Sequence, residues 1–281
     1  MSGKLLLVKQ TCYLAIFMLI RYNLLCITMK DIYRNFFEPI KYYGVKTHED
    51  YLSIQPCIQA LDAFSRLTNH CLYVIDYYKQ NFLYVSSNGL FLKELDVHSM
   101  KKLGYEYYYN FVPPGDQRFL EIVNQEGFSF FYKINEDDRI DYSISYDFHI
   151  CGKHCRPILI NHKLTPLALN ERKQIWLALC VVTLAPKRSY GEVVIQSEKE
   201  AVKHIYDPAI CNWISIPKLF LTDVDVSILR LSAQGFSNKE IADLLFYDIN
   251  SIKFHKRQLF KKFGVDNTIE AIAYANLHKL I

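Results

Sequence analysis

The sequence lacks the signatures of several large enzyme classes. It contains no glycine-rich phosphate loop, no nucleophile elbow and no His-Glu-x-x-His zinc motif. The aspartate phosphoacceptor pattern of a response-regulator receiver and the core of a histidine kinase are also absent. We therefore expect a protein that is not an enzyme and that binds no cofactor.

Long apolar runs are also missing. The amino-terminal segment is apolar, but Lys9 and Arg21 interrupt it, and its unbroken part, Thr11–Ile20, is too short to span a bilayer. No small-residue cleavage site follows, so a secretory signal is not indicated. Three interpretations stay open for residues 1–28: a membrane tether, an amphipathic or core helix, and an extension outside the native protein if Met29 is the true start.

Cysteine is spread without the dense spacing of a secreted disulfide framework. The eight cysteines therefore indicate free thiols in a reducing compartment. Cys151-Gly-Lys-His-Cys155 offers two thiols and a histidine, which suit a soft metal or a redox pair. A structural zinc site needs four ligands, and no second cluster is evident. We expect a polar hairpin turn here and no metal site.

Composition indicates a globular chain with modest nonspecific affinity for nucleic acid. A length of 281 residues suggests two domains, and 51% hydrophobic with 22% charged residues is typical of folded protein. The formal net charge is +4. Any affinity for DNA must therefore come from a local basic surface rather than from the chain as a whole.

The last part of the chain, residues 221–281, has the punctuation of four helices. Side chains that accept hydrogen bonds from free backbone amides stand at the expected starts, and Gly235 and Gly264 stand at two expected ends. The spacing of one serine and one glutamate is that of a capping box. A fourth helix is expected from about 267 to 280, with a face of small residues. The predicted capping residues are Thr222, Ser237, Glu240 and Asp248.

The third of these helices is basic. The run 253–262 carries five lysines and arginines and no acid. At about 100° per residue, Ile252, Leu259 and Phe263 share a face that can bury. The opposite face suits a DNA major groove, because Lys and Arg meet phosphates or guanine edges and Asn pairs with adenine. The residues expected on that face are Asn250, Lys253, Phe254, Arg257 and Lys261.

An ordered set of residues in this stretch resembles the LuxR-type helix-turn-helix. The resemblance covers about the last 60 residues and implies a scaffold helix at 237–247 and a recognition helix at 248–263, with the motif at about 237–257. The matching residues are Leu221-Thr222, Gly235-x-Ser237-Asn-Lys-Glu-Ile-Ala242, Lys253-x-His255, Lys262-Phe-Gly-Val265 and Glu270-Ala271.

The same resemblance implies roles for single residues. Base-reading positions fall on Lys253, Phe254 and Arg257, the position of Lys239 meets phosphate, and the fourth helix helps the protein to dimerise. Phe254 is larger than the usual residue and favours apolar contact with a thymine methyl group. Asp225 stands where the family usually has glutamate, and Thr268 replaces a common arginine. Further candidates for DNA contact are Asn250, His255, Lys256 and Lys261.

The middle of the chain predicts an α+β domain after a helical lead-in at 29–65, in which Pro39 and Pro56 are expected as breakers. Alternation predicts a hairpin from 72 to 86, then two or three short helices broken at 113–115. Two strands, several helices and three further strands follow the α+β order. The three later strands are expected at 141–150, 157–166 and 175–184.

This order resembles a PAS sensory domain over residues 66–187. The resemblance implies a five-stranded antiparallel sheet with short helices on one face, enclosing a pocket for a small molecule. The aromatic run Tyr105–Phe111 is a candidate for the pocket lining, and core packing is the alternative. Residues 188–216 are expected to form a semi-structured linker, with a strand at 191–196, to the four-helix, all-α domain at 217–281.

These patterns indicate a cytoplasmic, one-component transcriptional regulator that binds double-stranded DNA as a homodimer. RNA polymerase is a candidate partner, and an unknown small molecule is a candidate ligand of the PAS-like domain. Two alternatives stay open. The terminal bundle could dock a partner protein, because Phe254 and Phe260 place apolar surface on or beside the basic face. A membrane-tethered regulator depends wholly on residues 1–28.

Overall fold

The computed structural model describes most of the chain from residue 44 onward. The expected apolar extension, Pro39 and residues 153–155 of the Cys151–Cys155 run lie outside the described residues. Within the described part, no helix is long and apolar enough to cross a bilayer. The described ranges are 44–92, 94–152, 156–185 and 192–281.

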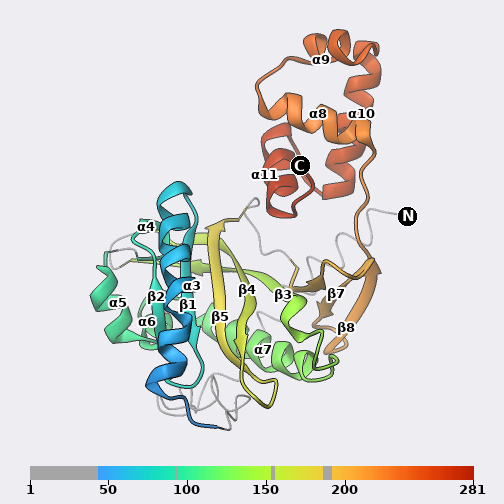
Figure 1. The fold of residues 1–281 in the computed structure, drawn as a ribbon. Coiled ribbons are helices and arrows are strands. Elements are labelled where there is room, and N and C mark those ends of the chain that lie inside the picture. Colours follow the sequence, from blue (N-terminus) through green and yellow to red (C-terminus); the bar gives the residue numbers. More distant parts are fainter. Residues whose placement is uncertain (1–43, 93, 153–155, 186–191) are drawn as a thin grey trace. The chain divides into compact units, whose positions relative to one another are not determined.

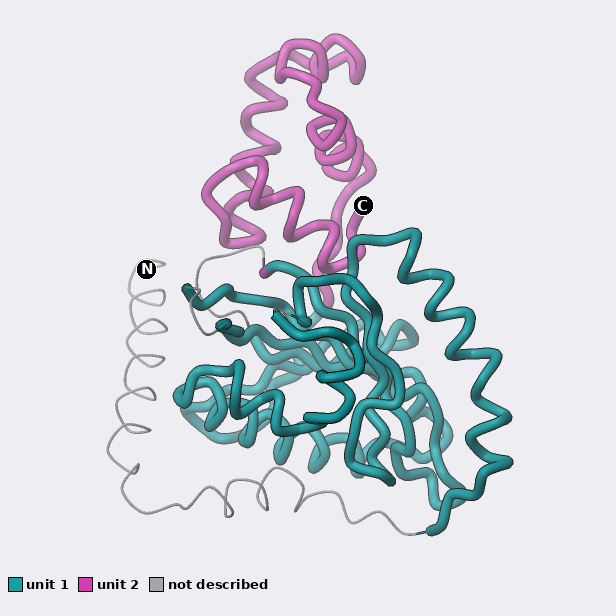
Figure 2. Tube along the Cα trace, turned by 90° about the vertical axis from the view of Figure 1, so that its left-hand side faces the viewer, with its two compact units in different colours: residues 1–184, 190–217 teal, residues 185–189, 218–281 magenta. Residues whose placement is uncertain are grey.

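The chain divides into two compact units (Figure 2). Unit 1 comprises residues 1–184 and 190–217, and unit 2 comprises residues 185–189 and 218–281. The first unit combines a large antiparallel sheet with helices, and the second is helical throughout. Each unit has its own buried core, so each is described separately below.

A single antiparallel sheet forms the centre of unit 1 (Figure 1). Its eight strands lie in the order β2-β1-β5-β4-β3-β6-β7-β8. The predicted hairpin is present as the first two strands, with Gln80 in the turn at φ 55°. The strands are β1 Cys71–Asp76, β2 Asn81–Val85, β3 Tyr142–Ile150, β4 Ile158–Leu169, β5 Ile175–Leu184, β6 Val194–Ser197, β7 Val202–Asp207 and β8 Asn212–Pro217.

The sheet is larger than the five strands that the sequence predicts. The segment expected as a semi-structured linker forms β6, β7 and β8, and β6 pairs with β3. This meander is anchored because Val193 and Tyr206 are buried against Val123 of helix α7 (Pro114–Phe131). The sequence predicts one strand in this segment, at 191–196, and the structure has β6 at Val194–Ser197. The two strands that follow are short and partly polar, so the alternation of the sequence did not distinguish them from a linker.

Helix α3 (His48–Leu67) covers one face of the sheet. Ile54, Ile58 and Leu61 pack against a cluster that includes the buried strand residues Leu72 and Trp176. Pro56 lies inside this helix, so its prediction as a breaker is wrong. Proline removes one helical hydrogen bond, but the apolar contacts on both sides of Pro56 hold the helix against the sheet.

Short helices cover the other face of the sheet (Figure 1). The break expected at residues 113–115 is the start of α7. Pro114 is the first residue of this helix, where a backbone amide has no hydrogen-bond partner within the helix, so proline is well tolerated there. The helix then continues past Gly127 to Phe131. The shorter helices are α4 Gly89–Leu92, α5 Val97–Leu103, α6 Glu106–Phe111 and the 3-10 helix η1 Arg139–Asp141.

The aromatic run in α6 belongs to the core, so it does not form the predicted pocket lining. Tyr107 is fully buried, with its ring centroid 4.5 Å from that of Phe91 and 4.9 Å from that of Phe111. The Tyr73 hydroxyl forms hydrogen bonds with the Tyr108 hydroxyl at 2.7 Å and with His162 Nε2 at 2.5 Å. Burial lowers the pKa of His162 to about 3, so this histidine is a neutral structural group.

Unit 2 is a bundle of four helices with the predicted order. Asn267 caps the last helix, which ends at Leu277, earlier than expected. Ala271 and Ala275 are fully buried beside Leu229, as the small-residue face predicts. The helices are α8 Asp223–Ala233, α9 Asn238–Leu245, α10 Ile249–Phe263 and α11 Thr268–Leu277.

A hydrogen bond between side chains joins α8 to α10. His255 Nδ1 lies 3.0 Å from Asp225 Oδ1, and the other carboxylate oxygen accepts a hydrogen bond from the Thr222 amide at 3.3 Å. Burial raises the pKa of Asp225, but the hydrogen bonds from His255 and Thr222 outweigh it, so this pKa lies below the ordinary value. The carboxylate therefore serves both the helix cap and the contact between the helices.

Acid should weaken unit 2 through this carboxylate. Because its pKa is lower in the folded state, its contribution is complete above its unfolded pKa of about 3.9 and is lost as the pH falls through the folded pKa. The unfolding free energy of the wild type should fall as the pH is lowered from about 5 to about 3, and we expect this fall to be smaller in Asp225→Asn. Urea denaturation of the full chain measures it. Asp223→Asn on the same helix is the matched control and should keep the wild-type slope.

Candidate nucleic-acid interface

Helix α10 has an apolar back and an exposed basic front. Ile252, Leu259 and Phe263 are buried to 0%, 1% and 3% exposure, as the spacing predicts. The helix has no acidic residue between its start and its end. Five of the eight candidate DNA-contact residues lie exposed on this helix: Asn250, Lys253, Phe254, Arg257 and Lys261.

The start of α10 is fixed by its cap. Asp248 accepts hydrogen bonds from the amides of Asn250 at 2.8 Å and Ser251 at 3.0 Å. The other end stops at Gly264, whose φ of 64° is a conformation that glycine adopts at low cost. The caps therefore define the length over which the basic side chains are presented.

Helix α9 holds α10 in place across a three-residue turn, 246–248. The Ser237 hydroxyl accepts from the Glu240 amide at 3.3 Å, while the Glu240 carboxylate accepts from the Ser237 amide at 2.8 Å. This is the predicted capping box. Lys239 is exposed in the first turn of α9. Ile241 is buried, whereas Leu244 is 52% exposed.

Three basic residues near the front have other partners or surroundings. His255 is held by Asp225 and is half-buried, so the structure places it at the contact between α8 and α10. Lys256 is half-buried, and burial lowers its pKa. The Lys262 ammonium donates a hydrogen bond to the backbone carbonyl of Phe220. The exposed front is therefore narrower than the basic run in the sequence.

Apolar side chains interrupt the basic front. Phe254 is 52% exposed and Ile249 is 38% exposed. Ile249, Lys253 and Arg257 are spaced four residues apart, so they share one helix face. Sequence reasoning missed Ile249, although this spacing places it there. Phe246, in the turn, was also missed: it is 96% exposed and has a φ of 58°.

The described residues contain no group of three or more His, Cys, Asp or Glu side chains that could hold a metal ion. The chemistry exposed on α10 is that of cations, two amides and two apolar side chains. Such a set matches the phosphates, base edges and thymine methyl groups of duplex DNA.

Sequence comparison identifies relatives of unit 2. Residues 219–275 match the family model described as bacterial regulatory proteins, luxR family. Fimbriae Z protein of Escherichia coli (strain K12) is 38% identical over 71 residues, which cover 25% of this chain and 34% of that protein. Oxygen regulatory protein NreC of Staphylococcus aureus (strain bovine RF122 / ET3-1) is 36% identical over 67 residues, covering 24% and 31%.

Comparison with solved structures gives matches of low overall structural similarity to this chain. A complex of Vibrio cholera VqmA with ligand and DNA is 13% identical, with 79% of this chain and 88% of that chain covered and a TM-score of 0.32. The response regulator ChrA of a heme-sensing two-component system is 35% identical over 24% of this chain and 33% of its own, with a TM-score of 0.23.

The family match and the geometry of α8–α11 concern the same part of the molecule. The match at 219–275 spans all of α8, α9 and α10 and most of α11. The alignment spans about a third of the length of the curated relatives, so it describes unit 2 alone. The carboxy-terminal unit of this chain is a helix-turn-helix domain of the luxR family of bacterial regulatory proteins.

Proposed function

We propose that the protein is a sequence-specific transcriptional regulator that reads duplex DNA through α10. The observation that carries the proposal is the division of this helix into a buried apolar back and an exposed front of cations without acids. The relatives of unit 2 include curated regulatory proteins, which supports the same function.

Each exposed side chain of α10 has a role that its chemistry suits. Lys253 and Arg257 are one helical turn apart and meet phosphates or guanine edges, with Arg257 able to bind a guanine through two hydrogen bonds. Asn250 suits adenine, and Phe254 suits a thymine methyl group. Lys261, near the end of the helix, suits a phosphate. His255 contributes by holding α8 against α10 through Asp225.

Unit 1 is proposed as a PAS-like domain that senses a signal or mediates association. Its antiparallel sheet with short helices on one face supports this assignment, although three additional strands extend the sheet. The proposed regulator is a one-component, cytoplasmic homodimer, since paired half-sites are usual for helix-turn-helix domains. RNA polymerase is a candidate partner. Docking of a protein by unit 2 has less support, because its exposed front is mainly cationic.

Loss of Arg257 should weaken binding at one base pair. Arg257→Ala is expected to cost about 1–3 kcal/mol and to relax the preference at that position if the side chain pairs with guanine. Selection of bound duplexes from a random DNA pool supplies the operator, and titration of that operator measures the cost. A two-fold symmetric operator would support the homodimer. Arg118→Ala, on the surface of unit 1, is the control. Equal binding of the operator by the wild type, Arg257→Ala and Arg118→Ala would show that Arg257 does not contact the bases.

Loss of Lys239 should weaken DNA binding without changing sequence preference. A phosphate contact contributes to binding through counterion release, so Lys239→Ala should reduce the slope of log affinity against log salt by about 1. Titrations of the operator and of an unrelated duplex at several salt concentrations measure both effects. Lys102 is exposed on α5, and Lys102→Ala should leave the slope unchanged. An unchanged slope in Lys239→Ala would contradict the phosphate contact.

A further inference from the structure

Strand β8 forms one edge of the sheet in unit 1 (Figure 1). It belongs to the meander that extends the sheet beyond the five strands expected for the sensor domain, so this edge is not part of the sensor fold that the sequence resembles. The described residues pair β8 with β7 alone, in a register that runs without a bulge from Asp207 opposite Asn212 to Val202 opposite Pro217. The outer side of β8 therefore offers a regular row of backbone groups to another strand.

Alternate residues of β8 turn their backbone groups away from β7. The Tyr206 amide of β7 donates to a carbonyl on the β6 side, so the backbone groups of Tyr206 do not face β8. Its partner across the ladder, Trp213, consequently directs its amide outward, where the side-chain oxygen of Asn212 accepts from it at 2.9 Å. Because this direction alternates along an antiparallel strand, Ser215 and Pro217 face outward with Trp213.

The composition of β8 leaves this edge open to pairing. Pro217 has no amide hydrogen, and a strand tolerates proline where the missing hydrogen faces away from the neighbouring strand. Charged side chains commonly keep edge strands apart, but β8 carries none between Asn212 and Pro217. Two copies of this strand therefore bring no like charges together.

The side chains of β8 make the strand complementary to itself. Trp213 packs on the side of α7, with its ring centroid 5.2 Å from that of Phe130. Since side chains alternate along a strand, Ile214 and Ile216 lie on the opposite face. Ile214 is 39% exposed and Ile216 is half-buried. The two isoleucines flank Ser215 symmetrically, so the strand presents the same apolar pattern when its direction is reversed.

We propose that β8 is the surface through which two copies of this chain associate, as antiparallel strands related by a two-fold axis at Ser215. In this register Ile214 of each copy lies opposite Ile216 of the other, and the apolar side chains of both strands meet on one face. The Ser215 amide of each copy donates to the Ser215 carbonyl of the other. The Trp213 amide donates to the Pro217 carbonyl of the second copy in place of the Asn212 side chain.

This surface gives a location to the homodimer of the proposed function, and it rests on that dimer. It does not rest on the way in which α10 reads DNA. Association is therefore measured on the full chain without DNA, so that a failure of strand pairing is distinguishable from a failure of DNA binding.

Charged substitutions test the register of the two strands. Ile214→Lys and Ile216→Glu should each weaken the dimer about tenfold in sedimentation equilibrium, because a charge then faces an isoleucine of the other copy. The double variant should regain most of the wild-type affinity, since the lysine of each copy then faces the glutamate of the other. Ile210→Lys is the control, because Ile210 is 60% exposed in the turn before β8 and outside the paired stretch.

A disulfide tests the same surface if a charged variant does not fold. Opposed residues that exchange backbone hydrogen bonds have Cα atoms about 5.5 Å apart, which is within the range of a disulfide. Ser215→Cys should therefore form a covalent dimer under mild oxidation, in a Cys211→Ser background that removes the exposed thiol nearby. Ile210→Cys in the same background should not, because its two copies are about ten strand positions, or about 30 Å, apart.

Three results would overturn this surface. The first is a wild type that is monomeric at every concentration, which would leave β8 as an edge for an extended segment of another protein. The second is a dimer whose affinity neither Ile214→Lys nor Ile216→Glu changes. The third is equal cross-linking of Ser215→Cys and Ile210→Cys. The last two would leave the proposed reading of DNA by α10 intact, whereas the expected pairing without any selected operator would refute that function and retain the surface.

Discussion

Burial of the apolar back of α10 is the constraint on which the DNA-binding surface depends. Ile252, Leu259 and Phe263 have almost no exposure, so the helix cannot rotate about its axis without exposing them to water. That constraint fixes which way Lys253 and Arg257 point. The basic front is therefore a consequence of hydrophobic packing on the opposite side of the same helix.

Hydrogen bonds then fix the position of this helix along and around its axis. Asp248 sets its first residue, and Asp225 reaches across from α8 to His255. Aspartate is one methylene shorter than the glutamate usual in similar domains, and here it still bonds both the helix cap and the histidine. Packing and polar contacts thus both restrict the position of α10.

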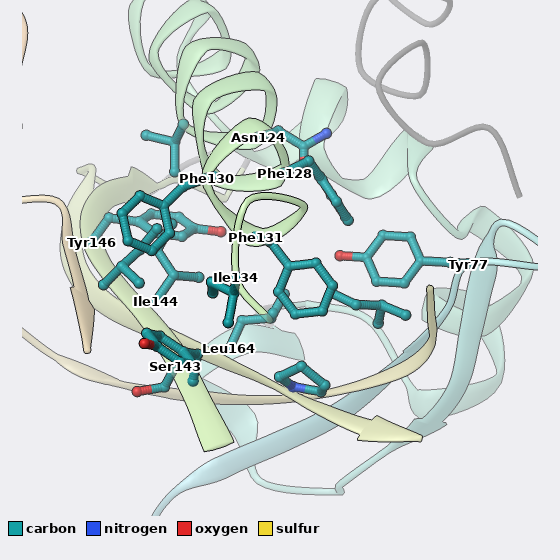
Figure 3. A pocket seen from close by; sticks show the side chains of 16 residues that line it. Tyr77, Asn124, Phe128, Phe130, Phe131, Ile134, Ser143, Ile144, Tyr146 and Leu164 are labelled. Atoms are coloured by element: carbon teal, nitrogen blue, oxygen red, sulfur yellow. The ribbon is translucent and has the colours of Figure 1, made fainter. Parts of the chain in front are cut away.

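Local rules explain how much of this was predictable from the sequence. The caps at Thr222, Ser237 and Asp248, and the buried positions of α10, depend on residues a few places apart, so the sequence predicts them well. Pro56 and the strands β7 and β8 depend on contacts with distant residues, which override local propensity. A cavity of about 60 Å³ in unit 1 (Figure 3) was missed for the same reason, because its lining residues Tyr77, Gly127 and Tyr146 meet only after the sheet has formed.

The extension of the sheet has a practical meaning for cutting the chain into parts. The strands β6–β8 lie at one side of the sheet, and β6 occupies the hydrogen-bonding edge of β3. A fragment of unit 1 that ends near residue 187 would leave that edge open, and open edges promote association with other chains. A fragment of unit 2 that begins there would carry three strands without their sheet. The natural point of division is between Pro217 and Lys218, because the last strand, β8, is then kept together with its pairing partner β7.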